Sequence, residues 1–275
     1  MDAAGKELIA RRLLTPRMAA YLTRSFAMLR RFIVTLVPLL VLSALTPDPR
    51  HQYASAGNLP DQDSLQSLVA LDRGLCLLVG ETSASRIADL AESTSLTIVV
   101  QCIDMTDVRQ LQAELDQKRL LGTRVYVSQI ENGRLCLAGN LASVVVADGN
   151  DIAHSELIRV LRPRGRLLVD GRTVIKPVPE GTGEWTHPYQ DAANNPLAGD
   201  RLATAPYLTK FLSAPYYGPM PEITLSSGGR LFKAFGHLAF KEREWPMLGK
   251  LIAMDGYNGT LLWERDMEPG FMIHR

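Results

Sequence analysis

Residues that could take part in chemistry gather just after an apolar run in the first third of the chain. Residues 75–80 end in Gly80 and are followed by Glu81, Thr82 and three further small residues, before a helical pattern that opens near Arg86. A buried strand, a tight turn and a helix form the usual nucleotide-binding arrangement of α/β proteins. Such turns normally contain several glycines, because backbone must approach the ligand closely. This turn has only Gly80, so the sequence leaves open whether a nucleotide can bind.

Other polar residues are weaker candidates for a site. Asp148 follows a later apolar run and could be a site acid or a turn-forming residue before Gly149. Thr82 or Ser83 could instead cap the following helix. His187 could be catalytic or a hydrogen-bonded structural histidine. No His, Cys, Asp and Glu residues have metal-ligand spacing, and no GxSxG or P-loop motif occurs, so no metal is predicted.

Apolar strand patterns alternate with amphipathic helix patterns through the region that holds these residues. The predicted strands are residues 75–80, 96–103, 124–127, 141–147 and 166–169. The predicted helices are residues 86–91, 107–120 and 152–161, the last ended by Pro163. This alternation predicts a Rossmann-like, doubly wound parallel sheet of the α/β class with helices on both faces. A ligand should therefore lie at the carboxyl ends of the strands.

Composition narrows the class of partner. Charged residues make up 21% of the 275 residues and the formal net charge is +1, so nothing favours nucleic acid as a partner. The three cysteines form neither a disulfide framework nor a CxxC pair. Cys76 and Cys102 lie in apolar runs, which indicates small core residues.

The N-terminal region, residues 1–56, is predicted to be a signal peptide or membrane anchor followed by a linker. Residues 32–45 are apolar and uncharged, and Arg30 and Arg31 precede them. A basic flank before about 14 apolar residues is typical of a secretory signal peptide. An uncleaved anchor and a buried core helix remain alternatives. We expect an exported protein, periplasmic or in the cell envelope. The possible translation starts are Met1, Met18 and Met28.

The C-terminal part changes character. Residues 57–175 hold the α/β pattern, 176–222 form a Pro-rich connector, and a β pattern begins at 223. Gly228-Gly229 separates two short apolar runs. Asn258-Gly259 separates two more and is a strong hairpin indicator.

Residues 75–171 resemble a class I S-adenosylmethionine-dependent methyltransferase domain. The run LIRVLRPRGRLLV at 157–169 closely follows the helix-turn-strand of these enzymes, and 142–148 resemble their fourth strand. The family's second strand ends in an acidic residue that hydrogen-bonds the cofactor ribose, and Asp104 matches it, the alternative being that Asp104 is an ordinary loop cap. The resemblance implies S-adenosylmethionine as cofactor, the implied binding residues being Gly80, Glu81, Thr82, Asp104 and Asp148.

The chain also departs from that family. The first loop of the family's domain is Gly-rich, whereas residues 81–85 of this chain contain no glycine. Each Cβ there would penalise a positive φ by roughly 1 kcal/mol or more. Arg164 replaces the first glycine of the usual Pro-Gly-Gly turn. Residues 148–151 do not match the Asn/Asp-Pro-Pro-Tyr motif of amino-group methyltransferases. These departures suggest decayed cofactor binding.

Residues 250–263 resemble the repeat of pyrroloquinoline-quinone-type β-propellers, and residues 185–196 resemble the segment that leads into one. In such a blade Trp263 would dock between neighbouring sheets. The resemblance implies a partial all-β propeller blade at 223–275. Because a propeller needs about four to eight blades, we expect a fragment whose partner is the remaining blades, in a longer chain or another protein. A small β subdomain packed on the α/β domain is the alternative.

Three functions follow as expectations. The first is a methyltransferase-like domain, degenerate in cofactor binding, that acts as a scaffold or interaction module of an exported propeller protein. The second is an active S-adenosylmethionine-dependent methyltransferase, which export disfavours because that cofactor is cytoplasmic. The third is an accessory part of a quinone-dependent oxidoreductase.

Overall fold

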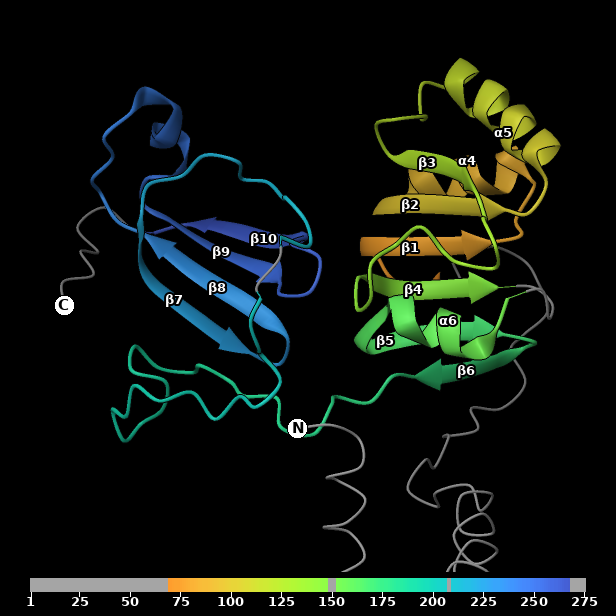
Figure 1. Cartoon of the computed structure of the whole chain (residues 1–275). Helices are drawn as coiled ribbons and strands as arrows, with labels where there is room; N and C mark the ends of the chain where they lie inside the picture. The colour runs from red at the N-terminus through yellow and green to blue at the C-terminus, as the bar shows by residue number, and fades with distance from the viewer. Residues whose placement is uncertain (1–68, 148–151, 207–208, 268–275) are drawn as a thin grey trace, which may run out of the picture. The chain divides into compact units, whose positions relative to one another are not determined.

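The computed structural model describes residues 69–147, 152–206 and 209–267 (Figure 1). The chain divides into two units, residues 1–52 and 53–275, and every described residue belongs to the second. The predicted signal or anchor segment, including residues 32–45, lies outside the described residues, as does Asp148. No helix within the described ranges is long and apolar enough to cross a membrane.

A six-stranded sheet forms the first half of this unit. Its strands are β1 Arg73–Val79, β2 Ser95–Cys102, β3 Val125–Gln129, β4 Ala142–Ala147, β5 Leu161–Val169 and β6 Arg172–Ile175. Their order is β3-β2-β1-β4-β5-β6, and the first five strands are parallel (Figure 1). The prediction of a parallel, Rossmann-like sheet is therefore confirmed. The sequence did not predict β6, which pairs antiparallel with β5.

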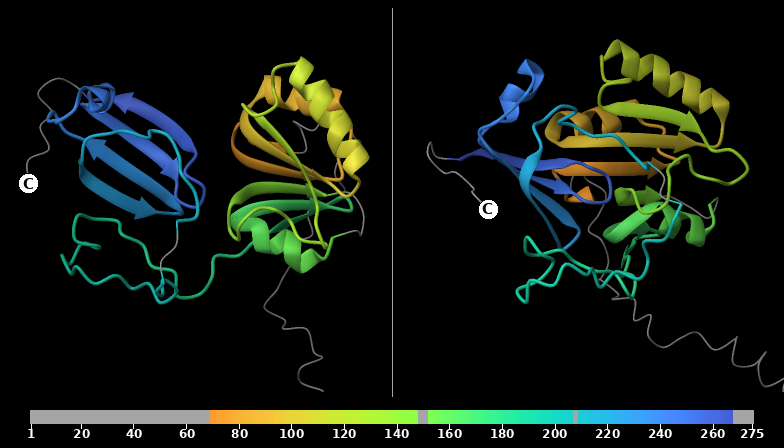
Figure 2. Two further views of the ribbon diagram at one scale, coloured as in Figure 1. Left: turned by 45° about the horizontal axis from the view of Figure 1, so that its top comes forward. Right: turned by 60° about the vertical axis from the view of Figure 1, so that its left-hand side comes forward.

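Helices cover both faces of this sheet, as the alternation predicted (Figure 2). They are α4 Ala84–Ser93, α5 Met105–Gln117 and α6 His154–Val160. Successive side chains of β1 point to opposite faces: Leu78 joins the core with α4 and α5, and Leu77 joins the core with α6. Cys76 and Cys102 are buried in the first of these cores, which confirms their prediction as core residues.

The boundary between α6 and β5, near Pro163, differs from its prediction. We expected a helix to residue 161 and a strand from 166, but α6 ends at Val160 and β5 begins directly at Leu161. Ala142 pairs with Leu161 and Val144 with Arg166, so the residues between them bulge out of the strand. Arg164 lies in this bulge at a φ of 62°, a conformation that favours the glycine found there in the resembled family.

Lys176, just after β6, links that strand to the end of α6 by hydrogen bonds from its side chain. Its ammonium donates to the carbonyl oxygens of Ile158 and Leu161 and to Asn140 Oδ1, each at 2.7 Å. Ile158 lies in the last turn of α6 and Leu161 directly follows the helix, so the ammonium lies at the C-terminal end of α6, where the helix dipole favours a cation. β6 is short and half exposed, and this contact accounts for its position at the sheet edge.

A second, four-stranded antiparallel sheet contains β7 Pro221–Ser227, β8 Arg230–Phe235, β9 Lys250–Asp255 and β10 Leu261–Asp266. A 3₁₀ helix, η1 Glu242–Met247, connects β8 to β9. Gly228, Gly229 and Gly259 all have positive φ, which confirms both predicted turns. The strands pair in sequence order, but one such sheet does not establish a propeller blade.

Polar contacts join the two sheets within the unit. Asn258 Nδ2 donates to Leu141 O at 2.9 Å and to Ser143 Oγ at 3.0 Å. Arg162 Nε lies 3.0 Å from Asp255 Oδ2, and both side chains are largely buried. The hairpin turn of the second sheet is therefore held against the start of β4 and the bulge of β5.

Candidate functional site

The predicted cofactor residues Gly80, Glu81, Thr82 and Asp104 lie at one edge of the parallel sheet. Gly80 follows β1 and Asp104 follows β2, and these strands pair directly in register. Gly80 N–H donates to Gln101 O at 2.9 Å, which closes the first loop onto the end of β2. Glu81 is adjacent and half-buried, whereas Thr82 is exposed. The strand order thus brings Gly80, Glu81 and Asp104 to the carboxyl edge where α/β proteins bind ligands.

The backbone of the first loop differs from what its missing glycines suggested. Gly80 has a φ of 81°, which favours glycine. Residues 81–85 all avoid positive φ. The expected Cβ penalty at these positions is therefore wrong, because the loop turns at its single glycine.

Glu81 forms the main polar contacts of this loop. Its Oε1 accepts a hydrogen bond from Ser83 N–H at 2.9 Å, and its Oε2 lies 2.9 Å from Arg86 Nη1. The Glu81 side chain is only 11% exposed. Ser83 is the N-cap of α4, and its Oγ accepts from Arg86 N–H at 3.4 Å. The structure therefore assigns the cap to Ser83 rather than Thr82, and a carboxylate from the chain itself covers the start of α4.

Asp104 caps the next helix. Its Oδ1 accepts from Thr106 N–H at 2.7 Å at the start of α5, and the side chain is exposed. The hydrogen bond from the Thr106 backbone holds the pKa of Asp104 below its ordinary value. Asp104 is thus an accessible anion at neutral pH that follows the end of β2 and caps α5, which agrees with the loop-cap alternative.

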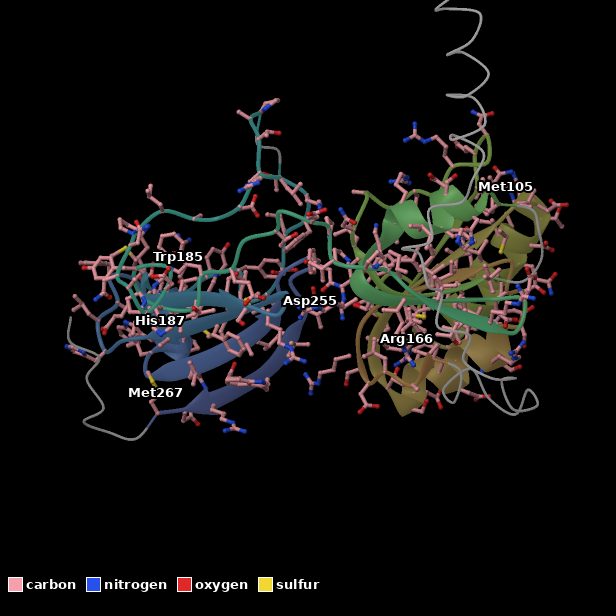
Figure 3. The ribbon with its side chains drawn as sticks, turned by 90° about the horizontal axis from the view of Figure 1, so that it is seen from below. Met105, Arg166, Trp185, His187, Asp255 and Met267 are labelled. Carbon is pink, nitrogen blue, oxygen red and sulfur yellow. The ribbon has the colours of Figure 1, made fainter. Side chains whose placement is uncertain are left out.

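A groove that the sequence did not predict begins at the residue after Asp104. It has a volume of about 720 Å³ and is lined by residues of α5, β3 and the loop after β3, among them Met105, Arg109, Gln129, Arg134 and Cys136. Figure 3 labels Met105 at the end of α5 that faces this groove. Its size falls in the range of small-molecule sites.

Buried Gln101 supports one wall of that groove. Its Nε2 donates to Ser128 Oγ at 3.1 Å, and its Oε1 accepts from Cys136 N–H at 3.1 Å. Gln101 is fully buried in β2, so its amide fixes the loop after β3. A buried glutamine at the end of an apolar strand was the only sequence indication of this wall.

The remaining candidates fall elsewhere. His187 Nδ1 lies 2.9 Å from Thr186 Oγ, in agreement with a hydrogen-bonded histidine. No group of three His, Cys, Asp or Glu residues in the described part of the chain could hold a metal ion.

No protein-family model matches the chain, and no curated protein matches it. Solved structures do. A candidate S-adenosyl-L-methionine-dependent methyltransferase from Methanococcus maripaludis is 17% identical, with a TM-score of 0.34 over 38% of this chain and 50% of that one. A candidate sarcosine dimethylglycine methyltransferase from Galdieria sulphuraria is 16% identical, with a TM-score of 0.33 over 37% of this chain and 40% of that one. An S-adenosylmethionine-dependent methyltransferase from Aquifex aeolicus is 16% identical, with a TM-score of 0.32 over 35% of this chain and 55% of that one.

The chain thus spans between 40% and 55% of the length of these structures. With TM-scores this low, the fold class rests on the strand order and pairing of the six-stranded sheet. That order defines a Rossmann-like α/β domain.

Proposed function

We propose that the α/β domain keeps the architecture of an S-adenosylmethionine-dependent methyltransferase but is degenerate in cofactor binding, and that it serves as a scaffold or interaction module. One observation supports this most: the Glu81 carboxylate is bound to Ser83 N–H and to Arg86 at the start of α4. Free N–H groups at a helix start are the donors that α/β proteins offer to a ligand.

In this chain two N–H groups at that helix start have partners. Ser83 N–H bonds Glu81 and Arg86 N–H bonds Ser83 Oγ. A ligand oxygen at this place would have to displace a carboxylate that belongs to the chain and is held by an ion pair. The competing group is tethered, so its effective concentration is high, and the ligand's affinity falls accordingly.

The test is calorimetric titration of the whole chain with S-adenosylmethionine, wild type against Glu81→Ala. The proposal expects no saturable binding to the wild type in the micromolar range. Micromolar binding that is lost in Asp104→Ala would contradict it.

A second candidate is an active S-adenosylmethionine-dependent methyltransferase. The observation in its favour is the exposed Asp104 carboxylate beside the groove that begins at Met105. Methyl transfer can run largely on positioning, so the absence of an identified base does not argue against it. The same titration separates the two candidates, because this one requires binding that depends on Asp104.

We further propose that the antiparallel sheet serves as a blade-like module completed by other blades, and that residues 1–56 direct export. In support, the four strands form a meander, and Trp263 of β10 packs near Phe232 of β8 with 6.2 Å between ring centroids. Fusion of residues 1–56 to a reporter that is active only outside the cytoplasm tests export. An inactive reporter would refute the export proposal.

A further inference from the structure

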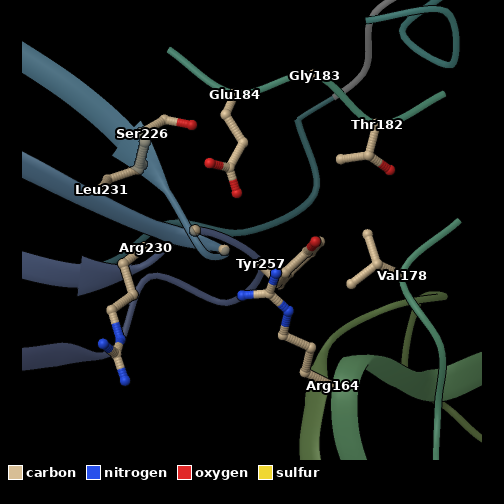
Figure 4. A pocket seen from close by; sticks show the side chains of 11 residues that line it. Arg164, Val178, Thr182, Gly183, Glu184, Ser226, Arg230, Leu231 and Tyr257 are labelled. Carbon is tan, nitrogen blue, oxygen red and sulfur yellow. The ribbon is translucent and has the colours of Figure 1, made fainter. Parts of the chain in front are cut away.

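A small pocket lies away from the predicted cofactor residues, beside the turns of the antiparallel sheet. Its volume is about 200 Å³, which is room for a molecule of a few heavy atoms. Figure 4 shows side chains of different segments facing it. The lining residues that carry the argument are Arg164, Glu184 and Tyr257.

Arg164 reaches this pocket from a strained backbone position. Its φ is 62°, which costs a side-chain-bearing residue roughly 1 kcal/mol relative to glycine. The conformation is fixed by pairing with Lys176, because Arg164 N–H donates to Lys176 O at 2.8 Å and Lys176 N–H donates to Gly165 O at 3.0 Å. Strain of this kind that persists in a fold is grounds for suspecting a function.

Among the described residues the Arg164 guanidinium forms no close ion pair, although its charge contributes to lowering the pKa of Glu184, whereas nearby Arg162 pairs with Asp255 at 3.0 Å. A Cβ built on Gly228 would lie 3.0 Å from Arg164 Nη1, so the guanidinium packs against the glycine turn. Arg230 also lines the pocket, but its guanidinium extends away from that of Arg164 (Figure 4). The planar, permanently charged guanidinium of Arg164 favours an oxyanion.

Tyr257 supplies a hydroxyl. A Cβ on Gly229 would lie 2.8 Å from Tyr257 Cε2, so the ring is packed against a backbone that admits no side chain. Burial raises the pKa of Tyr257, and the phenol stays protonated at neutral pH. In the described part of the chain its hydroxyl has no hydrogen-bond partner, and Figure 4 shows it in the pocket.

Glu184 adds one carboxylate to the pocket. Its oxygens accept from Gly228 N–H at 2.9 Å and from Ser227 Oγ at 3.0 Å. Hydrogen bonds from the Gly228 backbone and from Ser227 hold its pKa below the ordinary value, so Glu184 is ionised at neutral pH. Each oxygen retains a lone pair, which can accept a hydrogen bond from a ligand O–H but repels a fully deprotonated oxygen.

We propose that this pocket binds a small oxyanion that still carries a proton, of the hydrogen-phosphate class. Arg164 and the Tyr257 hydroxyl supply the donors, and Glu184 accepts a hydrogen bond from the ligand's own O–H. Sulfate has the same shape and no proton at neutral pH, so Glu184 disfavours it.

The test is calorimetric titration of the whole chain at constant ionic strength with inorganic phosphate, sulfate and O-phosphoserine. We expect saturable phosphate binding below about 10 mM, and sulfate binding at least about tenfold weaker. The second phosphate pKa of O-phosphoserine is about 6, so at neutral pH most of its phosphate carries no proton, and we expect it to bind more weakly than inorganic phosphate. Phosphoserine binding as tight as that of inorganic phosphate would contradict the requirement for a ligand proton.

Arg164→Gly is the informative variant, because glycine adopts a φ of 62° without strain and the fold is retained. We expect it to weaken phosphate binding at least about tenfold, with thermal stability equal or higher. Arg172→Gln removes the same charge from β6 and should leave binding within about twofold. The proposal is overturned by absent phosphate saturation, by equal affinities for sulfate and phosphate, or by unchanged binding in Arg164→Gly.

Discussion

Glu81 and Arg86 form an ion pair across the start of α4, with 2.9 Å between Glu81 Oε2 and Arg86 Nη1. The other Glu81 oxygen accepts from Ser83 N–H. The loop after β1 is thus closed by its own side chains, and the closure rests on a residue that the sequence singled out as a ligand contact. This is the physical basis for proposing weakened cofactor binding.

Replacing Glu81 by alanine removes that closure. We expect the free energy of unfolding to fall by about 1 kcal/mol, because one ion pair and one hydrogen bond are lost. We also expect saturable S-adenosylmethionine binding to appear below about 1 mM, since Ser83 N–H becomes available. Glu92→Ala, an exposed change in the same helix, is the control and should alter neither. Absence of binding in Glu81→Ala would show that the carboxylate is not what prevents it.

Glycine substitutions test the backbone of the same loop. Gly80→Ala places a Cβ at a φ of 81° and should destabilise the protein by about 1 kcal/mol or more. Thr82→Gly should not stabilise it, because Thr82 already has an ordinary φ and glycine only adds freedom to the unfolded chain. Urea denaturation measures both, and a more stable Thr82→Gly protein would mean that the loop is strained there.

Glu156 should dominate the acid sensitivity of α6. A hydrogen bond from Arg159 lowers the pKa of Glu156 from 4.5 to about 2. The unfolded carboxyl therefore takes up a proton at higher pH than the folded one, so its stabilisation is present above pH 4.5 and lost as pH falls to 2. Over this range wild type should lose about 2–3 kcal/mol more unfolding free energy than Glu156→Gln. Parallel pH profiles in urea denaturation would refute the assignment.

The Arg162–Asp255 pair should couple the two sheets. Asp255→Ala leaves a largely buried guanidinium without its anion and should cost about 3 kcal/mol. Combined with Arg162→Met, the loss should be smaller than the sum of the single losses, which a double-mutant cycle in urea measures. Glu264→Ala, at the more exposed Lys250 pair, is the control and should cost much less. Additive losses would mean that the pair does not join the sheets.

The sequence predicted the parallel sheet because strands such as β1 and β2 are short, continuous apolar runs that alternate with amphipathic helix patterns. It missed β6, since Arg172–Ile175 is half exposed and is positioned by the distant contact of Lys176 with α6. It also misplaced the start of β5, because a bulge around Arg164 resembles a strand boundary.

For the candidate site, strand ends alone were enough to place Gly80, Glu81 and Asp104 together. What Glu81 contacts depends on where α4 begins, since one turn of helix sets the distance to Arg86. The groove beside Met105 depends on Gln101, whose buried amide holds a loop distant in sequence. Such side-chain contacts are not encoded in local patterns.

The most direct measurement is calorimetric titration of the whole wild-type chain with S-adenosylmethionine. The proposed degenerate site predicts no saturable heat up to about 1 mM, because the tethered Glu81 carboxylate occupies the Ser83 N–H beside the start of α4. A dissociation constant in the micromolar range, abolished by Asp104→Ala, would contradict the account and establish a functional cofactor site.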